Sequence, residues 1–309
     1  MAGRLAILCP GQGAQHAGMF DLARLDPGAS RLLDEWFGDP QLAPLLRAAV
    51  ESEERFANRV AQPSIVAATL ATWSALRARL PEPALVAGYS IGELSAYGVA
   101  GALDPIEAVK LAVERARLMD ACLEGGPAQA MVALSGMPEG SVEALLSRFG
   151  FYSAIVTGDD ALVAGGPAAQ GEALAQAALA SGGRATLLPV TVPSHTPLLR
   201  GAVAPFAALL EEQCWSAPAF PVLSGISAEP VIDAKKAMLE LPRQIAEQIR
   251  WKDCMDACLE AGVTIALELG PGAALARMLQ ARHPHIACRS VSEFRSLDGI
   301  YSWLQRQLD

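Results

Sequence analysis

The segment from Gly88 to Gly92 has the residue types and spacing of a nucleophile site. It reads Gly-Tyr-Ser-Ile-Gly, with an apolar run (84–87) before it and a helical pattern (91–100) after it. This is the strand-to-helix setting of the Gly-x-Ser-x-Gly nucleophile elbow, whose turn has no room for flanking side chains. The turn also sets the serine hydroxyl at a helix N-terminus, where negative charge is favoured. Two glycines around a serine also arise by chance in a chain with 27 glycines, but the setting favours Ser90 as a nucleophile that carries an acyl group.

An activated serine needs a base, which is usually histidine. The chain has four histidines: His16, His195, His283 and His285. His195 lies in Val-Pro-Ser-His-Thr-Pro, and prolines on both sides stiffen the loop that would hold the imidazole. We therefore predict that His195 is the base. In the alternative, a serine esterase or thioesterase, the histidine comes late in the chain, so His283 or His285 would be the base and water the acyl acceptor.

The segment 10–15, Pro-Gly-Gln-Gly-Ala-Gln, follows the first apolar run of the chain. A dinucleotide-binding Gly-x-Gly-x-x-Gly would need glycine where His16 stands, and no Gly-Lys-Ser/Thr follows. We predict instead an oxyanion loop, in which main-chain N–H groups near Gln12 and Ile91 face the tetrahedral intermediate.

Short apolar runs that alternate with helical patterns must position these groups. Runs at 4–9, 84–87, 222–224 and 264–269 indicate buried strands, and helical patterns cover 62–80, 104–122, 197–213, 237–249, 252–261 and 273–281. Asp104-Pro-Ile-Glu107 is a good helix start, with Asp as N-cap, Pro at the first helical position and Glu three residues after the cap. The alternation predicts an α/β fold with a mostly parallel sheet.

The segment 128–190 has a different order of predicted strands and helices. Strands are expected at 131–135, 152–157, 161–164 and 184–190, and helices at 138–148 and 167–181. The order β-α-β-β-α-β is that of a ferredoxin-like unit. We therefore predict a ferredoxin-like subdomain at 128–192, inserted into a core domain formed by 1–127 and 193–309.

Composition narrows the possible partners. The chain has 309 residues, is 52% hydrophobic and carries a formal net charge of -9, which disfavours nucleic acid and anionic membrane surfaces as partners. The charge-free stretch 60–76 holds several polar residues and indicates a buried helix rather than a membrane span. The six cysteines show no Cys-x-x-Cys spacing. We expect a cytoplasmic protein with no metal site and no cofactor.

Five motifs carry a resemblance to a known family. They are Leu-Cys-Pro-Gly-Gln-Gly-Ala-Gln (8–15), Gly-Tyr-Ser-Ile-Gly-Glu (88–93), Arg-Ala-Arg-Leu-Met (115–119), Val-Pro-Ser-His (192–195) and Glu-Leu-Gly-Pro-Gly (268–272). Together they resemble the malonyl-CoA:acyl carrier protein transacylase family over nearly the whole chain. In that family malonyl-CoA acylates the serine, and the malonyl group then passes to a phosphopantetheine thiol of the carrier protein.

The resemblance implies a fold and a set of roles. The fold is an α/β-hydrolase-like parallel-sheet domain with a ferredoxin-like insertion. The implied roles are nucleophile for Ser90, base for His195, orientation of that histidine for Gln244, malonate-carboxylate ligand for Arg115, and oxyanion hole for Gln12 and Ile91. Arg117 lies two residues from Arg115 on the same expected helix and points elsewhere, so we expect it to be solvated.

Two segments depart from the family pattern. Tyr89 stands where histidine is usual, and Thr-Gly-Asp-Asp (157–160) replaces an Asn-Ser-Pro-x-Gln pattern. A tyrosine there is similar to the transacylase subunit associated with malonate decarboxylase, which implies a dedicated carrier protein as acceptor. A third hypothesis, a non-catalytic acyltransferase-like subunit, leaves unexplained why the serine, histidine, arginine and glutamine are all present.

Overall fold

The computed structural model describes residues 3–308 and is built around a six-stranded sheet. The strands are β1 (Leu5–Cys9), β2 (Leu85–Gly88), β7 (Val222–Leu223), β8 (Pro230–Val231), β9 (Ile265–Glu268) and β10 (Ala287–Ser290), in the order β10-β9-β1-β2-β7-β8. All neighbours are parallel except β8, which runs antiparallel to β7. The mostly parallel sheet predicted from the sequence is confirmed.

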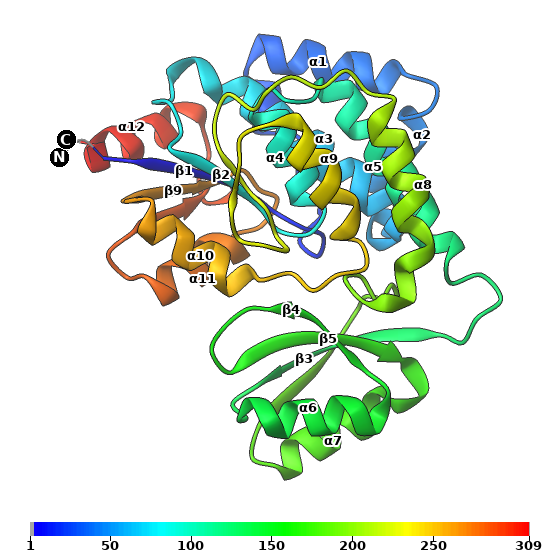
Figure 1. The fold of residues 1–309 in the computed structure, drawn as a ribbon. Coiled ribbons are helices and arrows are strands. Elements are labelled where there is room, and N and C mark those ends of the chain that lie inside the picture. Colours follow the sequence, from blue (N-terminus) through cyan, green and yellow to red (C-terminus); the bar gives the residue numbers. More distant parts are fainter. Residues whose placement is uncertain (1–2, 309) are drawn as a thin grey trace.

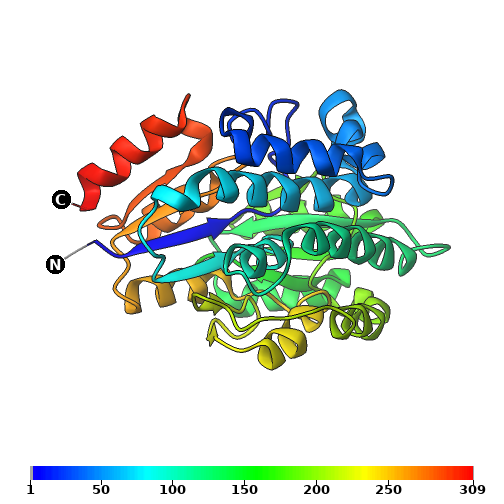
Figure 2. The ribbon, with the colours of Figure 1, turned by 90° about the horizontal axis from the view of Figure 1, so that it is seen from above.

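Helices cover both faces of this sheet (Figures 1 and 2). Because side chains alternate along a strand, Ile7 points into one hydrophobic cluster and Leu8 into the other. The Ile7 cluster contains α1 (Pro27–Gly38), α2 (Ala43–Glu51), α3 (Asn58–Leu76), α4 (Gly92–Val99), α5 (Pro105–Ala121), α8 (Arg200–Glu211), α9 (Ala234–Arg243) and α12 (Leu297–Leu308). The Leu8 cluster contains α10 (Trp251–Glu260) and α11 (Ala274–Arg282). Short 3-10 turns lie at Ala23–Leu25, Glu53–Phe56, Arg77–Arg79, Pro197–Leu199 and Val291–Glu293.

A second, antiparallel sheet lies beside the main one, with α6 and α7 on its outer face (Figure 1). Its elements are β3 (Gln129–Ser135), α6 (Glu139–Phe149), β4 (Tyr152–Val156), β5 (Ala161–Pro167), α7 (Ala168–Ala180) and β6 (Arg184–Leu188). The spatial order β4-β5-β3-β6 is that of a ferredoxin-like unit. Val132 and Leu134 pack against α6 and α7, whereas Met131 packs into the Leu8 cluster. The domain boundaries at 128 and 192 stay a prediction.

The sequence prediction was wrong about the end of α9. The helix ends at Arg243 instead of continuing to Ile249. The next residues join the second sheet, because the Val156 N–H donates to the Ile249 carbonyl at 2.9 Å and the Ile249 N–H donates to the Ala154 carbonyl at 2.9 Å. Segment 244–250 therefore ties the two sheets together. In the stretch 3–308, no helix is long and apolar enough to cross a membrane.

Candidate active site

Ser90 occupies a sharp turn between β2 and α4. A Cβ at Gly88 would lie 2.3 Å from the Glu93 backbone, and one at Gly92 would lie 2.1 Å from the Cys9 carbonyl oxygen. Only glycine fits at either place, as the elbow motif requires. Ser90 itself has a φ of 56°, a left-handed conformation that is uncommon for a residue with a side chain. Such backbone strain costs about 1–3 kcal/mol and clusters at functional sites.

His195 lies against Ser90, as the sequence predicts. The distance from Ser90 Oγ to His195 Nε2 is 2.7 Å. His195 Nδ1 lies 2.5 Å from the main-chain carbonyl oxygen of Gln244. A carbonyl only accepts, so Nδ1 carries the proton and Nε2 has a free lone pair for the serine O–H. The pair is therefore arranged for the histidine to take the serine proton.

The backbone around His195 is fixed on both sides. His195 has a φ of 64°, and its N–H donates to the Ile245 carbonyl at 2.8 Å. The Thr196 hydroxyl donates to the Pro193 carbonyl at 2.7 Å. These bonds hold the imidazole in one orientation, which a general base requires.

Burial keeps this imidazole neutral. His195 is 1% exposed, and burial, with a smaller contribution from the nearby Arg115 charge, lowers the pKa of His195 to about 3. A neutral histidine is the form that accepts a proton. The free protein therefore holds its base in the reactive form at neutral pH.

The predicted oxyanion loop lies next to the nucleophile. A Cβ at Gly11 would lie 3.7 Å from Ser90 Cβ, which places the loop directly beside the serine. Within residues 3–308, the main-chain N–H groups of Gln12 and Ile91 donate to no protein acceptor. Two free N–H donors near the serine are what an oxyanion hole needs.

Gln244 contacts His195 through its main chain, whereas its side chain binds other groups. The side-chain amide donates to the Ser90 carbonyl at 3.0 Å and to Glu93 Oε2 at 2.7 Å. Its oxygen accepts from Arg115 at 3.0 Å. One residue therefore links the histidine, the elbow and the predicted carboxylate ligand.

Arg115 is buried near the nucleophile, whereas Arg117 is solvated. Arg115 is 1% exposed and donates to the side-chain oxygens of Gln62, at 2.7 Å, and Gln244, at 3.0 Å. Burial lowers its pKa to about 10. The Arg117 side chain is 62% exposed and pairs with Glu114. Gln62 and Glu93 were not predicted as site residues, although Glu93 belongs to the elbow motif.

His283 and His285, near the end of the chain, contact other residues than Ser90. His283 Nε2 lies 2.9 Å from Asp256, whose carboxylate also binds Arg282, and the rings of His283 and His285 lie edge to face. The esterase hypothesis, which needs one of these histidines beside Ser90, receives no support from this arrangement.

Both departures from the family pattern meet the start of α10. The Tyr89 ring packs edge to face on Trp251, with ring centroids 5.2 Å apart. Asp159 pairs with Lys252 at 3.4 Å and with Arg282 at 3.3 Å. The two segments therefore contact neighbouring residues at the start of α10, Tyr89 on the buried side and Asp159 on the exposed side.

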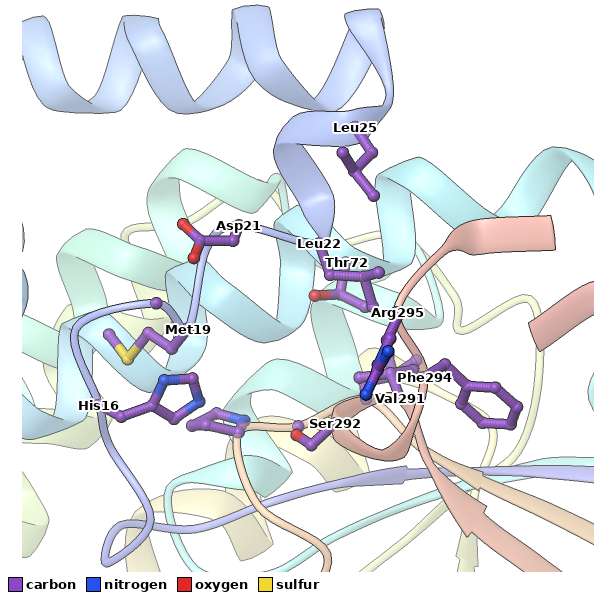
Figure 3. Close-up of a pocket in the computed structure, with 14 residues that line it drawn as sticks. His16, Met19, Asp21, Leu22, Leu25, Thr72, Val291, Ser292, Phe294 and Arg295 are labelled. Atoms are coloured by element: carbon purple, nitrogen blue, oxygen red, sulfur yellow. The ribbon is translucent and has the colours of Figure 1, made fainter. Parts of the chain in front are cut away.

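A separate cavity of about 330 Å³ is lined by residues of segments 16–25, 269–271 and 291–295 and by Thr72 (Figure 3). His16, Asp21, Thr72, Ser292 and Arg295 supply its polar lining. None of the predicted site residues lines it. His16 is thereby placed outside the candidate active site.

Comparison with known proteins identifies the family of the chain. The model of the acyl transferase domain family matches residues 7–289. The malonyl CoA-acyl carrier protein transacylase of Mycobacterium tuberculosis is 32% identical over 301 residues, covering 96% of this chain and 99% of that protein. The Haemophilus influenzae protein of the same name is 29% identical over 322 residues, covering 97% and 99%.

Solved structures show the same likeness. The malonyl CoA-acyl carrier protein transacylase of Coxiella burnetii superposes with a TM-score of 0.91 at 26% identity, covering 100% of this chain and 99% of that one. A malonyl-transacylase solved in complex with its type II PKS acyl-carrier protein gives a TM-score of 0.89 at 28% identity, covering 97% and 99%. The α/β-hydrolase-like fold and the resemblance drawn from the motifs are confirmed. The chain belongs to the acyl transferase domain family, among the malonyl CoA-acyl carrier protein transacylases.

Proposed function

We propose that the chain moves a malonyl group from malonyl-CoA, through an ester on Ser90, to the phosphopantetheine-type thiol of an acyl carrier protein. The observation that carries the proposal is the Ser90–His195 contact of 2.7 Å, with the histidine oriented by the Gln244 carbonyl. Relatives named as malonyl CoA-acyl carrier protein transacylases over nearly their whole length support it. The predicted cytoplasmic location remains part of this proposal.

The first half-reaction follows from the pair. Ser90 Oγ attacks the thioester carbonyl carbon while His195 Nε2 takes the hydroxyl proton. The N–H groups of Gln12 and Ile91 bind the oxyanion of the tetrahedral intermediate. The C–S bond then breaks, and the CoA sulfur leaves with the proton held by His195. The products are free CoA thiol and malonyl-Ser90.

The second half-reaction runs the same steps in reverse with the carrier thiol. His195 takes the thiol proton, the sulfur attacks the malonyl ester, and Ser90 recovers its proton as it leaves. Arg115 binds the malonyl carboxylate throughout, because a planar guanidinium suits a carboxylate. The buried position of Arg115 beside Gln244 supports this role.

We further propose that the acceptor is the carrier protein of a malonate decarboxylase system. Tyr89 and the segment 157–160 support this, because both meet the start of α10 and both differ from the usual family residues. A partner other than the general fatty-acid carrier would account for a changed surface in this region.

Transfer kinetics with two carriers test these proposals. We expect label from malonyl-CoA to appear on carrier thiol rather than as free malonate, which separates a transferase from a hydrolase. kcat/KM is expected to be higher for the malonate decarboxylase carrier than for the fatty-acid carrier. Equal or reversed values would remove the carrier assignment, whereas free malonate as the main product would favour the esterase alternative.

A further inference from the structure

Glu93 is a buried carboxylate with an unusual set of partners. It lies in the first turn of α4, three residues after Ser90, and is 0% exposed. Its Oε2 accepts from the Gly225 N–H at 2.9 Å and from the Gln244 amide at 2.7 Å. Its Oε1 has no hydrogen-bond partner within residues 3–308. Burial raises the pKa of Glu93 to about 7, so the side chain is an anion above neutral pH, and a buried anion needs a compensating charge nearby.

The nearby charge is Arg115, a buried cation that has no carboxylate bound to it in the described part of the chain. Its partners are two neutral amide oxygens, those of Gln62 and Gln244. The cation thus keeps N–H donors that no acidic side chain of the protein occupies.

Gln244 lies between the two charges. Its amide nitrogen faces Glu93 and its amide oxygen faces Arg115. Glu93 therefore fixes which end of the amide faces the guanidinium. It also offsets the buried positive charge without covering the guanidinium edge that a substrate carboxylate needs.

We propose that Glu93 is a positioning residue that limits the malonyl selectivity of the site: it holds the Gln244 amide against Arg115, and its charge offsets the attraction of Arg115 for the malonyl carboxylate. This inference rests on the proposed function, in which Arg115 binds the malonyl carboxylate. Glu93 holds Gln244 in the orientation that places Arg115, and its negative charge moderates the attraction of Arg115 for a second carboxylate. An acetyl group carries no carboxylate, so neither the charge of Arg115 nor that of Glu93 affects its binding.

Glu93→Gln separates the two effects. The side-chain oxygen of glutamine can accept from both Gly225 and Gln244, and its NH2 takes the place of the unpartnered oxygen. Position is retained while the charge is lost, so the attraction of Arg115 for a malonyl carboxylate increases. At pH 8, where Glu93 is ionised, we expect the malonyl-to-acetyl ratio of kcat/KM to rise roughly threefold to tenfold, through a lower KM for malonyl-CoA. Acetyl transfer should keep its wild-type rate.

Glu268→Gln is the matched control. Glu268 is also buried, at 1% exposed, accepts a backbone N–H from Ala276 at 2.8 Å, and has one oxygen without a partner in the range 3–308. Among the described residues, no hydrogen bond joins Glu268 to Gln244 or Arg115. We expect Glu268→Gln to leave the acyl selectivity unchanged.

Gln244→Glu gives an effect of opposite sign and serves if Glu93→Gln does not fold. The new carboxyl lies against Glu93, so the two groups share one proton. The carboxyl oxygen that faces Arg115 then pairs with it directly, and malonyl-CoA must compete with that pair. We expect the malonyl KM to rise by about tenfold or more, with a smaller change for acetyl-CoA.

The account also requires that the Glu93→Gln effect depend on Arg115. In the Arg115→Ala background, Glu93→Gln should no longer change the selectivity. An unchanged ratio in Glu93→Gln, an equal change for both acyl groups, or a shift that persists without Arg115 would overturn the inference. Malonylation of Ser90 in the wild type keeps the two failures apart: without it the proposed function fails, and with it only the role of Glu93 is lost.

Discussion

His195 donates its Nδ1–H to the main-chain carbonyl of Gln244 across 2.5 Å, so the base is oriented by a group that side-chain substitution leaves in place. The Gln244 side chain instead binds the Ser90 carbonyl, Glu93 and Arg115. The main chain of Gln244 thus contacts His195 and its side chain contacts Arg115, so the two contacts can be changed separately.

Gln244→Ala should therefore be milder than loss of the base. The carbonyl that orients His195 remains, whereas Arg115 loses an acceptor. A hydrogen bond to a charged group is worth ~1.5–3 kcal/mol, so we expect malonyl transfer to fall about tenfold to a hundredfold. Acetyl transfer should fall less. Steady-state kinetics with both acyl-CoAs give the answer, and equal losses would mean that the side chain serves the chemistry generally.

His195→Ala should reduce the acylation rate by at least about a thousandfold, because the serine proton then has no acceptor. His283→Ala and His285→Ala should leave it near the wild-type value, since His283 is bound to Asp256. Stopped-flow release of CoA measures this step. An essential His283 or His285 together with a dispensable His195 would reverse the assignment.

Arg115→Ala should reduce malonyl transfer about tenfold to a hundredfold and leave acetyl transfer unchanged or improved. The reason is that only malonyl brings a carboxylate to the buried guanidinium. Arg117→Ala is the control, because its side chain is exposed and pairs with Glu114. If both acyl groups lose rate equally in Arg115→Ala, the residue supports the fold rather than the choice of substrate.

Glu268 should make the stability of the protein depend on pH. Burial raises the pKa of Glu268 to about 7 from an ordinary value of 4.5, so the folded state keeps a proton that the unfolded state releases. The stabilising contribution is complete below pH 4.5 and is lost as the pH rises through 7. Relative to Glu268→Gln, the wild-type free energy of unfolding should decrease by roughly 2–4 kcal/mol over this range. Urea unfolding at several pH values measures it, and parallel curves would show that Glu268 does not titrate.

The turn that holds Ser90 and the helix that holds Arg115 were predictable because their signals are local. Gly88 and Gly92 fit a turn in which any Cβ would collide with backbone, and Asp104 caps the next helix with its own side chain. The alternating strands and helices likewise follow from periodicity within short windows. The β-α-β-β-α-β order of the second sheet was read in the same way.

What the sequence did not reveal depends on distant or main-chain partners. Glu93 accepts hydrogen bonds from Gly225 and Gln244, which lie 132 and 151 residues away in the sequence. No local sequence pattern predicts such contacts. Every residue has a main-chain carbonyl, so the sequence could not show that Gln244 contacts His195 through its carbonyl and not through its side chain. The strand β10 and the helix α12 were not predicted, and α9 was made too long because Ile249 joins the edge of β4.

The central claim is that Ser90 carries the acyl group, and intact-mass measurement after mixing with malonyl-CoA tests it most directly. One added malonyl mass is expected, located on Ser90 by peptide mapping. Less labelling is expected from acetyl-CoA and methylmalonyl-CoA, and none from malonyl-CoA in Ser90→Ala. Labelling that persists in Ser90→Ala, or a wild-type protein that takes up no malonyl mass, would contradict this claim.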